Sequence, residues 1–450
     1  MTKMFHPVQL RSSGLAVALT GIVVILCVAA SVSSQTALTI QDVRRLALEH
    51  NRTFLSARED VNIARSEITK AWSDALPDVS LSGGYNRNFT VPKVFFIANG
   101  ETMELQTGFK NSFGTRVSVS QPIWHGGKVF TALNIAKRYE AYSEAIADQV
   151  EDGVILNAEQ LFYATALARA QLEVWDKALE ANTANLEVVE KQFNQGMVSE
   201  YELLRARVER QNVLPEKIAA EAEVHLSEKR LLSFLGIELD EPVTVIEDLG
   251  DTSLANLPAL PDLIAQALAG RPEMIQAQHL VEISAKAIKV ARADYWPSFD
   301  AVGAYDWQSA SDSWTMTENE SSSWTAGITV SLELFNGGRT KGYVSQRKAE
   351  HNQARLNLQQ TRDNVRLEVE EAYTALLQAK KSLDIQGTTI ASAEEGHKIA
   401  QLRFESGVGT QLEVLSAQSA LIRARTARAA ALYGFRIARA KLRQATNIDL

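Results

Sequence analysis

The stretch from Phe113 to Lys128, FGTRVSVSQPIWHGGK, decides how this chain folds. Apolar and polar residues alternate along its first part, which is typical of a β-strand with one apolar and one polar face. The strand pattern ends at a pair of glycines, and a long helical pattern begins directly after them. The apolar face carries Val117, Val119 and Ile123, and the polar face carries Arg116, Ser118 and Ser120.

A second stretch of the same kind runs from Trp324 to Arg339, WTAGITVSLELFNGGR. It also alternates, passes through two glycines and enters a long helical pattern. Two strands that each turn into a long helix indicate an internal repeat. One face carries Ala326, Ile328, Val330, Leu332 and Leu334, and the other carries Thr325, Gly327, Thr329, Ser331 and Glu333.

The repeat extends over nearly the whole chain after the N-terminal leader. Asp42 recurs as Asp262, an offset of 220 positions (262 − 42), and Gly126 recurs as Gly337, an offset of 211 (337 − 126). The difference falls in the loop between the two strands of each pair. Because insertions are tolerated where backbone is exposed, we expect that loop to lie outside the packed body.

These patterns divide the chain into a signal peptide over 1–34, a first repeat over 35–239, a connector or equatorial region over 240–260, and a second repeat over 261–450. Each repeat begins with helices, continues through two strands and ends in two long helices. In the first repeat we expect strands over about 79–91 and 113–124 and long helices over about 128–193 and 199–235. In the second we expect strands over about 298–309 and 323–335 and long helices over about 339–404 and 410–446.

The N-terminus has the features of a secretory signal peptide, because Lys3 and Arg11 precede an apolar run over 15–30 that small serines follow. An anchoring transmembrane helix is the weaker alternative, since the run is short and ends in cleavable small residues. The only cysteine, Cys27, lies inside this run without the small residue that lipidation needs directly before it. We therefore expect a mature chain that is not lipidated and has no thiol.

Composition and motifs exclude several classes of function. A net charge of −8 without a basic run argues against nucleic-acid binding. The seven histidines are scattered, and no metalloprotease, esterase or phosphate-loop motif is present. We therefore expect no enzyme, no catalytic residue, no cofactor and no metal site. No apolar run of about 18 residues follows the signal peptide, so any membrane crossing has to be made by strands.

The strands impose a condition on assembly. A strand of about 13 residues reaches roughly 43 Å, enough to cross a hydrocarbon layer. A bilayer excludes open sheet edges, and four strands are too few to close a barrel, so several chains have to contribute. A soluble sandwich is the alternative. In the barrel, the polar faces would line a lumen, and lipid or its interface would contact Tyr85, Phe89, Tyr305, Trp307 and Trp324.

The helix after the second glycine pair has seven-residue spacing, which is typical of a coiled coil. One stripe consists of Val365, Ala372 and Ala379, and a second consists of Val369, Leu376 and Leu383. Such apolar stripes indicate helix packing rather than a ligand site.

Taken together, these motifs make the chain similar to the TolC-like outer-membrane efflux family. The match rests on the helix starts TIQDVRRLALEHN and LPDLIAQALAGRPE and on the strand entries ALPDVSLSGGY and YWPSFDAVGAY. It rests further on the strand exits QPIWHGGK and LELFNGGR and on the tip turns FNQGMVSEYELL and FESGVGTQLEVL.

The resemblance implies a homotrimer in the outer membrane of a Gram-negative bacterium. Its fold would be mixed α and β, with a 12-stranded transmembrane barrel, four strands per chain, continued by an α-helical coiled-coil tunnel in the periplasm. It implies a passive exit duct for drugs, toxic compounds or metals, with outer-membrane lipid, a periplasmic adaptor and an inner-membrane transporter as partners. Type I protein secretion and a soluble periplasmic scaffold are the alternatives.

Three sets of candidate residues follow. The resemblance places adaptor docking at the tip turns, and the glycine pairs after the strands would join barrel to tunnel. Glu202 and Glu413 could form entrance rings of carboxylates, although their spacing from Ser199 and Thr410 also suits helix capping, the reading we favour. The tip set is Phe193, Gly196, Val198, Ser199, Phe404, Gly407, Val408 and Thr410; the joint set is Gly126, Gly127, Gly337 and Gly338.

The chain departs from the family pattern at several positions. Gly409 and Ser416 stand where the family archetype has an arginine and an aspartate that help close the entrance. Phe404 stands in place of a tyrosine, and Arg52 in place of a proline. The gating network of the archetype therefore cannot be carried over.

Overall fold

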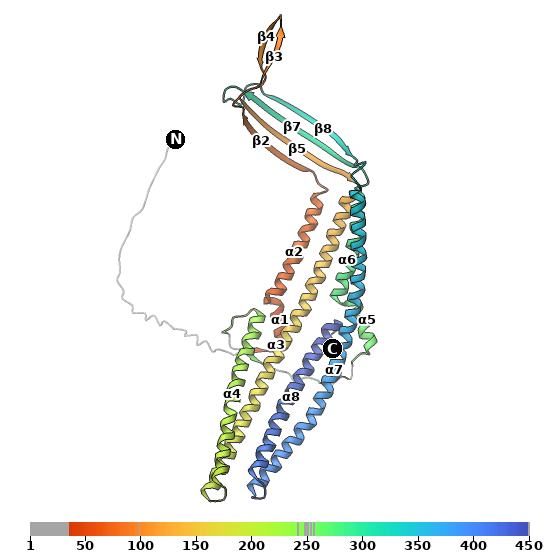
Figure 1. Ribbon diagram of the computed structural model, residues 1–450. Coiled ribbons are helices and arrows are strands. Elements are labelled where there is room, and N and C mark those ends of the chain that lie inside the picture. The colour runs from red at the N-terminus through yellow and green to blue at the C-terminus, as the bar shows by residue number, and fades with distance from the viewer. Residues whose placement is uncertain are drawn as a thin grey trace, which may run out of the picture.

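The computed structural model describes residues 36–98, 100–240, 243–246, 252, 254 and 257–448. The expected signal peptide and Cys27 lie outside these residues. The molecule is elongated, with a β-sheet at one end and paired helical turns at the other (Figure 1). This arrangement separates the two candidate regions, the joint below the sheet and the tips.

The helices repeat with the offsets that the sequence predicts, and each helix has the same length as its counterpart. The two longest helices have 67 residues, which corresponds to about 100 Å. The fold is therefore one unit used twice. The pairs are α1 (Ile40–His50) with α5 (Leu260–Gly270), α2 (Arg52–Ser73) with α6 (Pro272–Ala293), α3 (Lys128–Asn194) with α7 (Arg339–Glu405), and α4 (Glu200–Leu235) with α8 (Gln411–Thr446).

The sheet has four antiparallel strands in the order β2–β5–β7–β8. Its register separates an apolar row from a polar row, as the alternation predicts. Directly opposed residues on one face are Leu81, Val117, Tyr305 and Trp324; on the other they are Ser82, Arg116, Asp306 and Ser323. The strands are β2 (Asp78–Arg87), β5 (Asn111–His125), β7 (Ser298–Ser311) and β8 (Ser321–Ser331).

The strand ends differ from the sequence predictions. β2 ends at Arg87 rather than near residue 91, so Phe89 lies outside the strand, and β8 ends at Ser331 rather than near residue 335. β5 and β7 extend further than expected. The physical reason is pairing: β2 ends at Arg87, opposite the first residue of β5, and β8 ends at Ser331, opposite the first residue of β7.

Two segments expected to lack regular structure contain short strands. The loop after β2 forms a hairpin, β3 (Lys93–Ala98) and β4 (Glu101–Gln106), which projects beyond the sheet (Figure 1). The connector contains β6 (Val243–Val245), which pairs in parallel with β1 (Thr36–Leu38). Both pairings depend on partners that local periodicity does not identify.

The helices form a wall four helices wide. Next to the sheet the neighbours run α2–α3–α6–α7, and toward the tips they run α4–α3–α8–α7. In α7 the predicted stripe residues Val365, Val369 and Leu376 are buried. Because α3 and α7 take part in both halves, they join the sheet end to the tip end.

A buried charged group joins the two repeats. The Glu159 side chain on α3 is 1% exposed, and its carboxylate accepts hydrogen bonds from Arg44 Nε on α1 and, at 2.5 Å, from Arg443 Nη2 on α8. A carboxylate removed from water needs such partners. Glu159 therefore ties the first repeat to the last helix of the second.

An acidic cluster lies nearby on α3. Burial raises the pKa of Asp152 to about 6, and the neighbouring carboxylates of Glu151, Glu273 and Asp148 add to the shift, whereas Arg271 opposes it. Ionisation of Asp152 is thus disfavoured in the folded chain relative to the unfolded chain.

We expect Asp152→Asn to raise the thermal unfolding midpoint by a few degrees at about pH 8 and to leave it unchanged near pH 4. A folded pKa above the unfolded value means that the native protein loses stability as pH rises from about 4 to about 6, and the deficit persists above that range. Melting curves of the purified protein across this range test the effect. An equal shift at every pH would contradict it.

Candidate functional site: the paired helical tips

The tip site consists of two turns that lie side by side at the end of the molecule opposite the sheet (Figure 1). One turn, residues 195–199, joins α3 to α4, and the other, residues 406–410, joins α7 to α8. Each reverses a helix that runs the length of the wall. The site is therefore placed by the two longest helices of the chain.

Each turn is built around a glycine in the left-handed region. Gly196 has a φ of 70° and Gly407 a φ of 77°. The turns close with backbone hydrogen bonds back onto the ending helix, from Met197 N to Gln192 O at 2.9 Å and from Val408 N to Arg403 O at 2.9 Å. Glycine accepts this geometry without the strain that a β-carbon brings.

The two glutamates that follow the turns have different partners. Glu202 forms a reciprocal capping box: Ser199 Oγ accepts from Glu202 N at 3.3 Å, and the Glu202 carboxylate accepts from Ser199 N at 3.1 Å. Thr410 Oγ1 likewise accepts from Glu413 N, but the Glu413 carboxylate lies 3.5 Å from Arg403 Nε on α7. Each carboxylate thus has a local structural partner.

A small apolar core holds the tips together. It consists of Val189, Leu203, Ala206, Ala400, Phe404 and Val414, which come from both helix pairs. Gln411 Nε2 donates to Glu202 O at 3.2 Å across the same contact. Phe404 is buried in this core, whereas its counterpart Phe193 is 37% exposed, so the two aromatic residues of the predicted tip set have different environments.

Met197 and Val408 are apolar tip residues that are 67% and 71% exposed. They are equivalent at the offset of 211 (408 − 197), but the predicted tip set contains Val198 in place of Met197. Val198 packs partly buried against the tip core. Tyr201 and Leu412, a second equivalent pair, are 70% and 56% exposed and are absent from the predicted tip set.

Gly409 has a steric reason to lack a side chain. A β-carbon there would lie 3.0 Å from Arg403 Cβ and 3.1 Å from the Phe404 backbone nitrogen. A β-carbon at this position would therefore fit only if the turn or the end of α7 shifted by a few tenths of an ångström.

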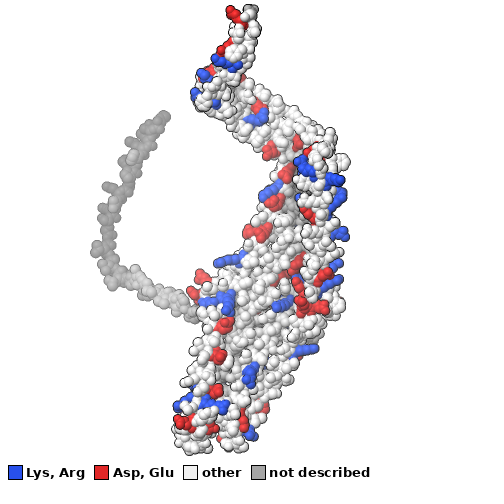
Figure 2. All heavy atoms as spheres, in the orientation of Figure 1, with Lys and Arg blue, Asp and Glu red and all other residues white. Residues whose placement is uncertain are grey.

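Charged side chains of both signs surround the tips, and the sheet is mostly uncharged in the same view (Figure 2). Near the tips, Arg207 Nη2 lies 3.3 Å from Glu190 Oε1. Together with the Arg403–Glu413 pair, this places two ion pairs near the exposed apolar residues. Apolar residues surrounded by polar ones are typical of surfaces that bind another protein.

The joint between sheet and helices is formed by the two glycine pairs. Gly126 and Gly337 have φ values of 62° and 66°, and Gly127 and Gly338 are left-handed N-caps of α3 and α7. A β-carbon on Gly126 would lie 2.6 Å from Ala293 O. Glycine is thus required at the first joint both by its backbone angle and by this close approach.

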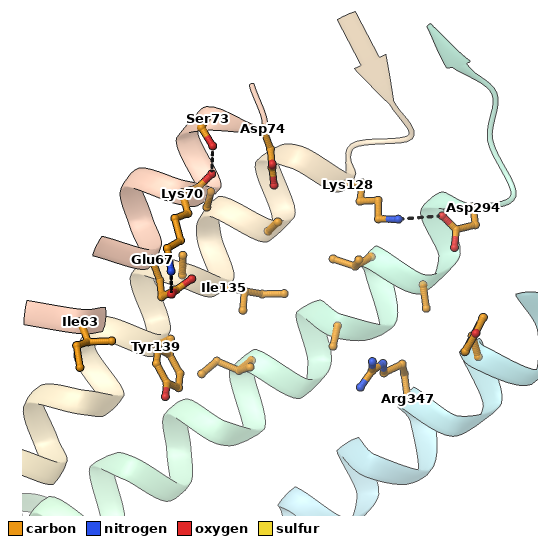
Figure 3. Close-up of a pocket in the computed structure, with 18 residues that line it drawn as sticks. Ile63, Glu67, Lys70, Ser73, Asp74, Lys128, Ile135, Tyr139, Asp294 and Arg347 are labelled. Atoms are coloured by element: carbon orange, nitrogen blue, oxygen red, sulfur yellow. Dashed lines mark hydrogen bonds and ion pairs between the residues drawn. The ribbon is translucent and has the colours of Figure 1, made fainter. Parts of the chain in front are cut away.

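A cavity of about 900 Å³ lies below the joint, lined by α2, α3, α6 and α7 (Figure 3). Two charged pairs lie along it: Lys128 Nζ lies 3.3 Å from Asp294 Oδ1, and Lys70 Nζ lies 2.5 Å from Glu67 Oε1. Asp74 and Arg347 also line the cavity. Ile63, Ile135 and Tyr139 form part of its apolar wall.

Within the described part of the chain, no cluster of three or more His, Cys, Asp or Glu side chains is arranged to hold a metal ion. No helix in the same residues combines the length and apolarity that crossing a membrane requires.

Comparison with known proteins gives a consistent result. A family model described as outer membrane efflux protein matches residues 43–237 and 263–447. The cation efflux system protein CusC of Escherichia coli O157:H7 is 24% identical over 84% of this chain and 79% of its own length. The outer membrane protein TolC of Vibrio cholerae is 21% identical over 90% of each chain.

Solved structures share the fold. The outer membrane protein VceC of Vibrio cholerae superposes with a TM-score of 0.74 at 18% identity, covering 90% of this chain and 95% of that one.

Proposed function

Because this chain belongs to the family of outer membrane efflux proteins, we propose that three copies assemble into a passive exit duct for small molecules. The protein lies in the outer membrane and extends into the periplasm. The observation that carries the proposal is the family match, which covers both repeats from the first helix to the last. CusC is by name a cation efflux protein, and we propose toxic small molecules or metal ions as the cargo class here.

Assembly into a closed ring is supported by the edges of the sheet. Every residue of β2 and of β8 is exposed, although the two strands have 10 and 11 residues. Unpaired backbone groups along strands of that length are costly in a bilayer and invite pairing with another chain. β2 and β8 also run in opposite directions, so β8 of one copy can pair antiparallel with β2 of the next.

The tips supply the proposed docking surface for a periplasmic adaptor, which would connect the duct to an inner-membrane transporter. Their exposed apolar residues lie at the end of the molecule opposite the sheet. These residues are Met197, Tyr201, Val408 and Leu412. Apolar side chains held on rigid turns are suited to binding a protein partner. We propose that transport energy comes from that transporter and that this chain has no catalytic activity.

The double variant Met197→Asp, Val408→Asp should reduce capture of the adaptor on the order of tenfold or more, because it places two charges in the apolar centre of the contact. In-cell crosslinking from position 201 followed by mass spectrometry measures the capture. Ile97→Asp in the β3–β4 hairpin is the matched control, since Ile97 is 78% exposed at the opposite end. Equal capture by the double variant and the control would contradict docking at the tips.

Export itself is tested by deleting the gene in its native host and measuring accumulation of a fluorescent dye and of toxic metal cations. We expect higher accumulation in the deletion strain and restoration by the wild-type gene. Unchanged accumulation of the dye and of the cations, together with loss of a secreted polypeptide from the medium, would instead support protein secretion.

A further inference from the structure

Two adjacent helical segments below the sheet contain seven cationic side chains and no carboxylate. The segments are 283–293, the second half of α6, and 339–349, the start of α7. The two helices pack against each other. Lys and Arg side chains line the right-hand edge of the molecule just below the sheet (Figure 2), where Figure 1 places α6 and α7. This part of the wall therefore has a local excess of positive charge.

The carboxylates that flank the two segments do not compensate this charge, because each already has a cationic partner. The four pairs are Glu282–Arg138, Asp294–Lys128, Glu333–Arg339 and Glu350–Arg347. Only two of the seven cations, Arg339 and Arg347, take part in these pairs. Among the described residues, the structure gives no ion pair to the other five. They are Lys286, Lys289, Arg292, Lys341 and Lys348.

Four of these five cations are exposed on one face of the helical wall. The cavity below the joint is lined by residues of all four helices, such as Ile283 of α6 and Tyr343 of α7. It therefore lies on the side toward which the wall curves. With 3.6 residues per turn, the four cations lie about 120–160° around their helices from the cavity-lining residues. They thus occupy the outward face, and we call them the basic patch: Lys289, Arg292, Lys341 and Lys348.

An aromatic cluster lies where the sheet meets these helices. The Trp124 ring centroid is 5.9 Å from that of Phe299 and 6.3 Å from that of Trp296. Phe299 is on the apolar face of the sheet, because it is six residues from Tyr305 along β7. In membrane barrels, aromatic side chains flank the apolar band at its two edges. Since α6 ends at Ala293, three residues before Trp296, the basic patch lies just beyond such an edge.

The helical fold itself does not require these cations. The first repeat forms helices of the same lengths, α2 and α3, and three of the four counterpart positions in them are uncharged. The offsets identify these counterparts (289 − 220 = 69, 292 − 220 = 72 and 341 − 211 = 130) as Thr69, Trp72 and Phe130. The basic patch is therefore a feature of the second repeat, and helix formation does not account for it.

We propose that the basic patch binds the phosphate groups of anionic phospholipids in the membrane leaflet that faces the periplasm. The proposal rests on the outer-membrane duct of the proposed function, in which the outward face of the wall meets that leaflet. Lys289, Arg292 and Lys341 lie within about 6 Å of the helix ends at the sheet, which is about the depth of a head-group layer. Lys348 lies about 14 Å from the start of α7, and side chains on a helix lean toward its N-terminus, here the membrane end.

Native mass spectrometry of the assembled protein, extracted from outer membranes and incubated with phosphatidylglycerol or phosphatidylcholine, measures this binding. We expect the wild type to retain phosphatidylglycerol in preference to phosphatidylcholine, and less of it as the salt concentration rises. A quadruple variant should retain phosphatidylglycerol at least about tenfold less, because each cation beside a membrane adds to the attraction of anionic head groups. The variant combines Lys289→Gln, Arg292→Gln, Lys341→Gln and Lys348→Gln.

A control variant removes the same number of exposed lysines and arginines from the tip-side halves of α3, α7 and α8. It combines Lys191→Gln, Lys381→Gln, Lys398→Gln and Arg423→Gln. Equal retention of phosphatidylglycerol by the two variants would overturn the proposal. Bound lipopolysaccharide in place of phospholipid, lost only from the patch variant, would overturn the assignment to the leaflet that faces the periplasm. A chain absent from outer membranes would instead contradict the proposed function, so the two failures are distinguishable.

Discussion

Replacing Gly236 with alanine is expected to destabilise the chain by about 3–5 kcal/mol. Gly236 ends α4 with a φ of 74°, a region in which a β-carbon costs roughly 1–2 kcal/mol. The new β-carbon would also lie 2.6 Å from His50 O at the end of α1. Because a backbone atom cannot move aside as a flexible side chain does, α1 and α4 would have to separate.

Gly196→Ala is the matched control for that prediction. Gly196 has a φ of 70°, but no neighbouring atom of the described residues lies within 4 Å of its β-carbon position. We expect this variant to lose only the backbone contribution of about 1–2 kcal/mol. Thermal unfolding midpoints of the two purified variants compare the effects, and a Gly196→Ala variant that loses as much stability as Gly236→Ala would show that the close approach to His50 is unimportant.

Replacing Glu159 with alanine is the second change for which we expect a large effect, a loss of about 3 kcal/mol. The substitution leaves Arg44 and Arg443 without the carboxylate that both contact and opens a void among α1, α3 and α8. The Arg44 and Arg443 side chains are 36% and 18% exposed. Partial hydration of these groups places the loss at the lower end of the range for a broken buried pair.

Glu282→Ala provides the comparison for a surface pair. Glu282 Oε2 lies 2.9 Å from Arg138 Nε, and both side chains are about half exposed. Pairs of this kind contribute about 0–1 kcal/mol. Unfolding midpoints of the two variants should therefore differ by several degrees, and equal midpoints would contradict a stabilising role for the Glu159 contacts between the repeats.

The sequence predicted the long helices well because their signals are local. Heptad spacing, glycine turns and capping residues lie within each helix or next to it, and the expected bounds differ from α3, α4, α7 and α8 by a residue at most. The repeat offsets were visible for the same reason. The β3–β4 hairpin was not predicted, although the Asn99-Gly100 pair between its strands is a local signal for a hairpin turn.

Other features depend on residues far apart in the sequence. No local pattern links Glu159 to Arg443, or Glu413 to Arg403, so these ion pairs emerge only when the helices are placed together. The equivalence of Met197 with Val408 follows from the offset of 211 that also relates Gly126 to Gly337. The position at which β8 ends also depends on pairing, because β8 is an edge strand that has one partner, β7, in a single chain.

Native mass spectrometry of the protein extracted from outer membranes tests the central claim most directly. A four-stranded sheet with two open edges can close into a barrel only with further copies. We therefore expect an assembly of three chains of this protein alone. A population of single chains or of dimers, in a preparation that retains dye export when reconstituted with its partners, would contradict the proposed trimeric duct.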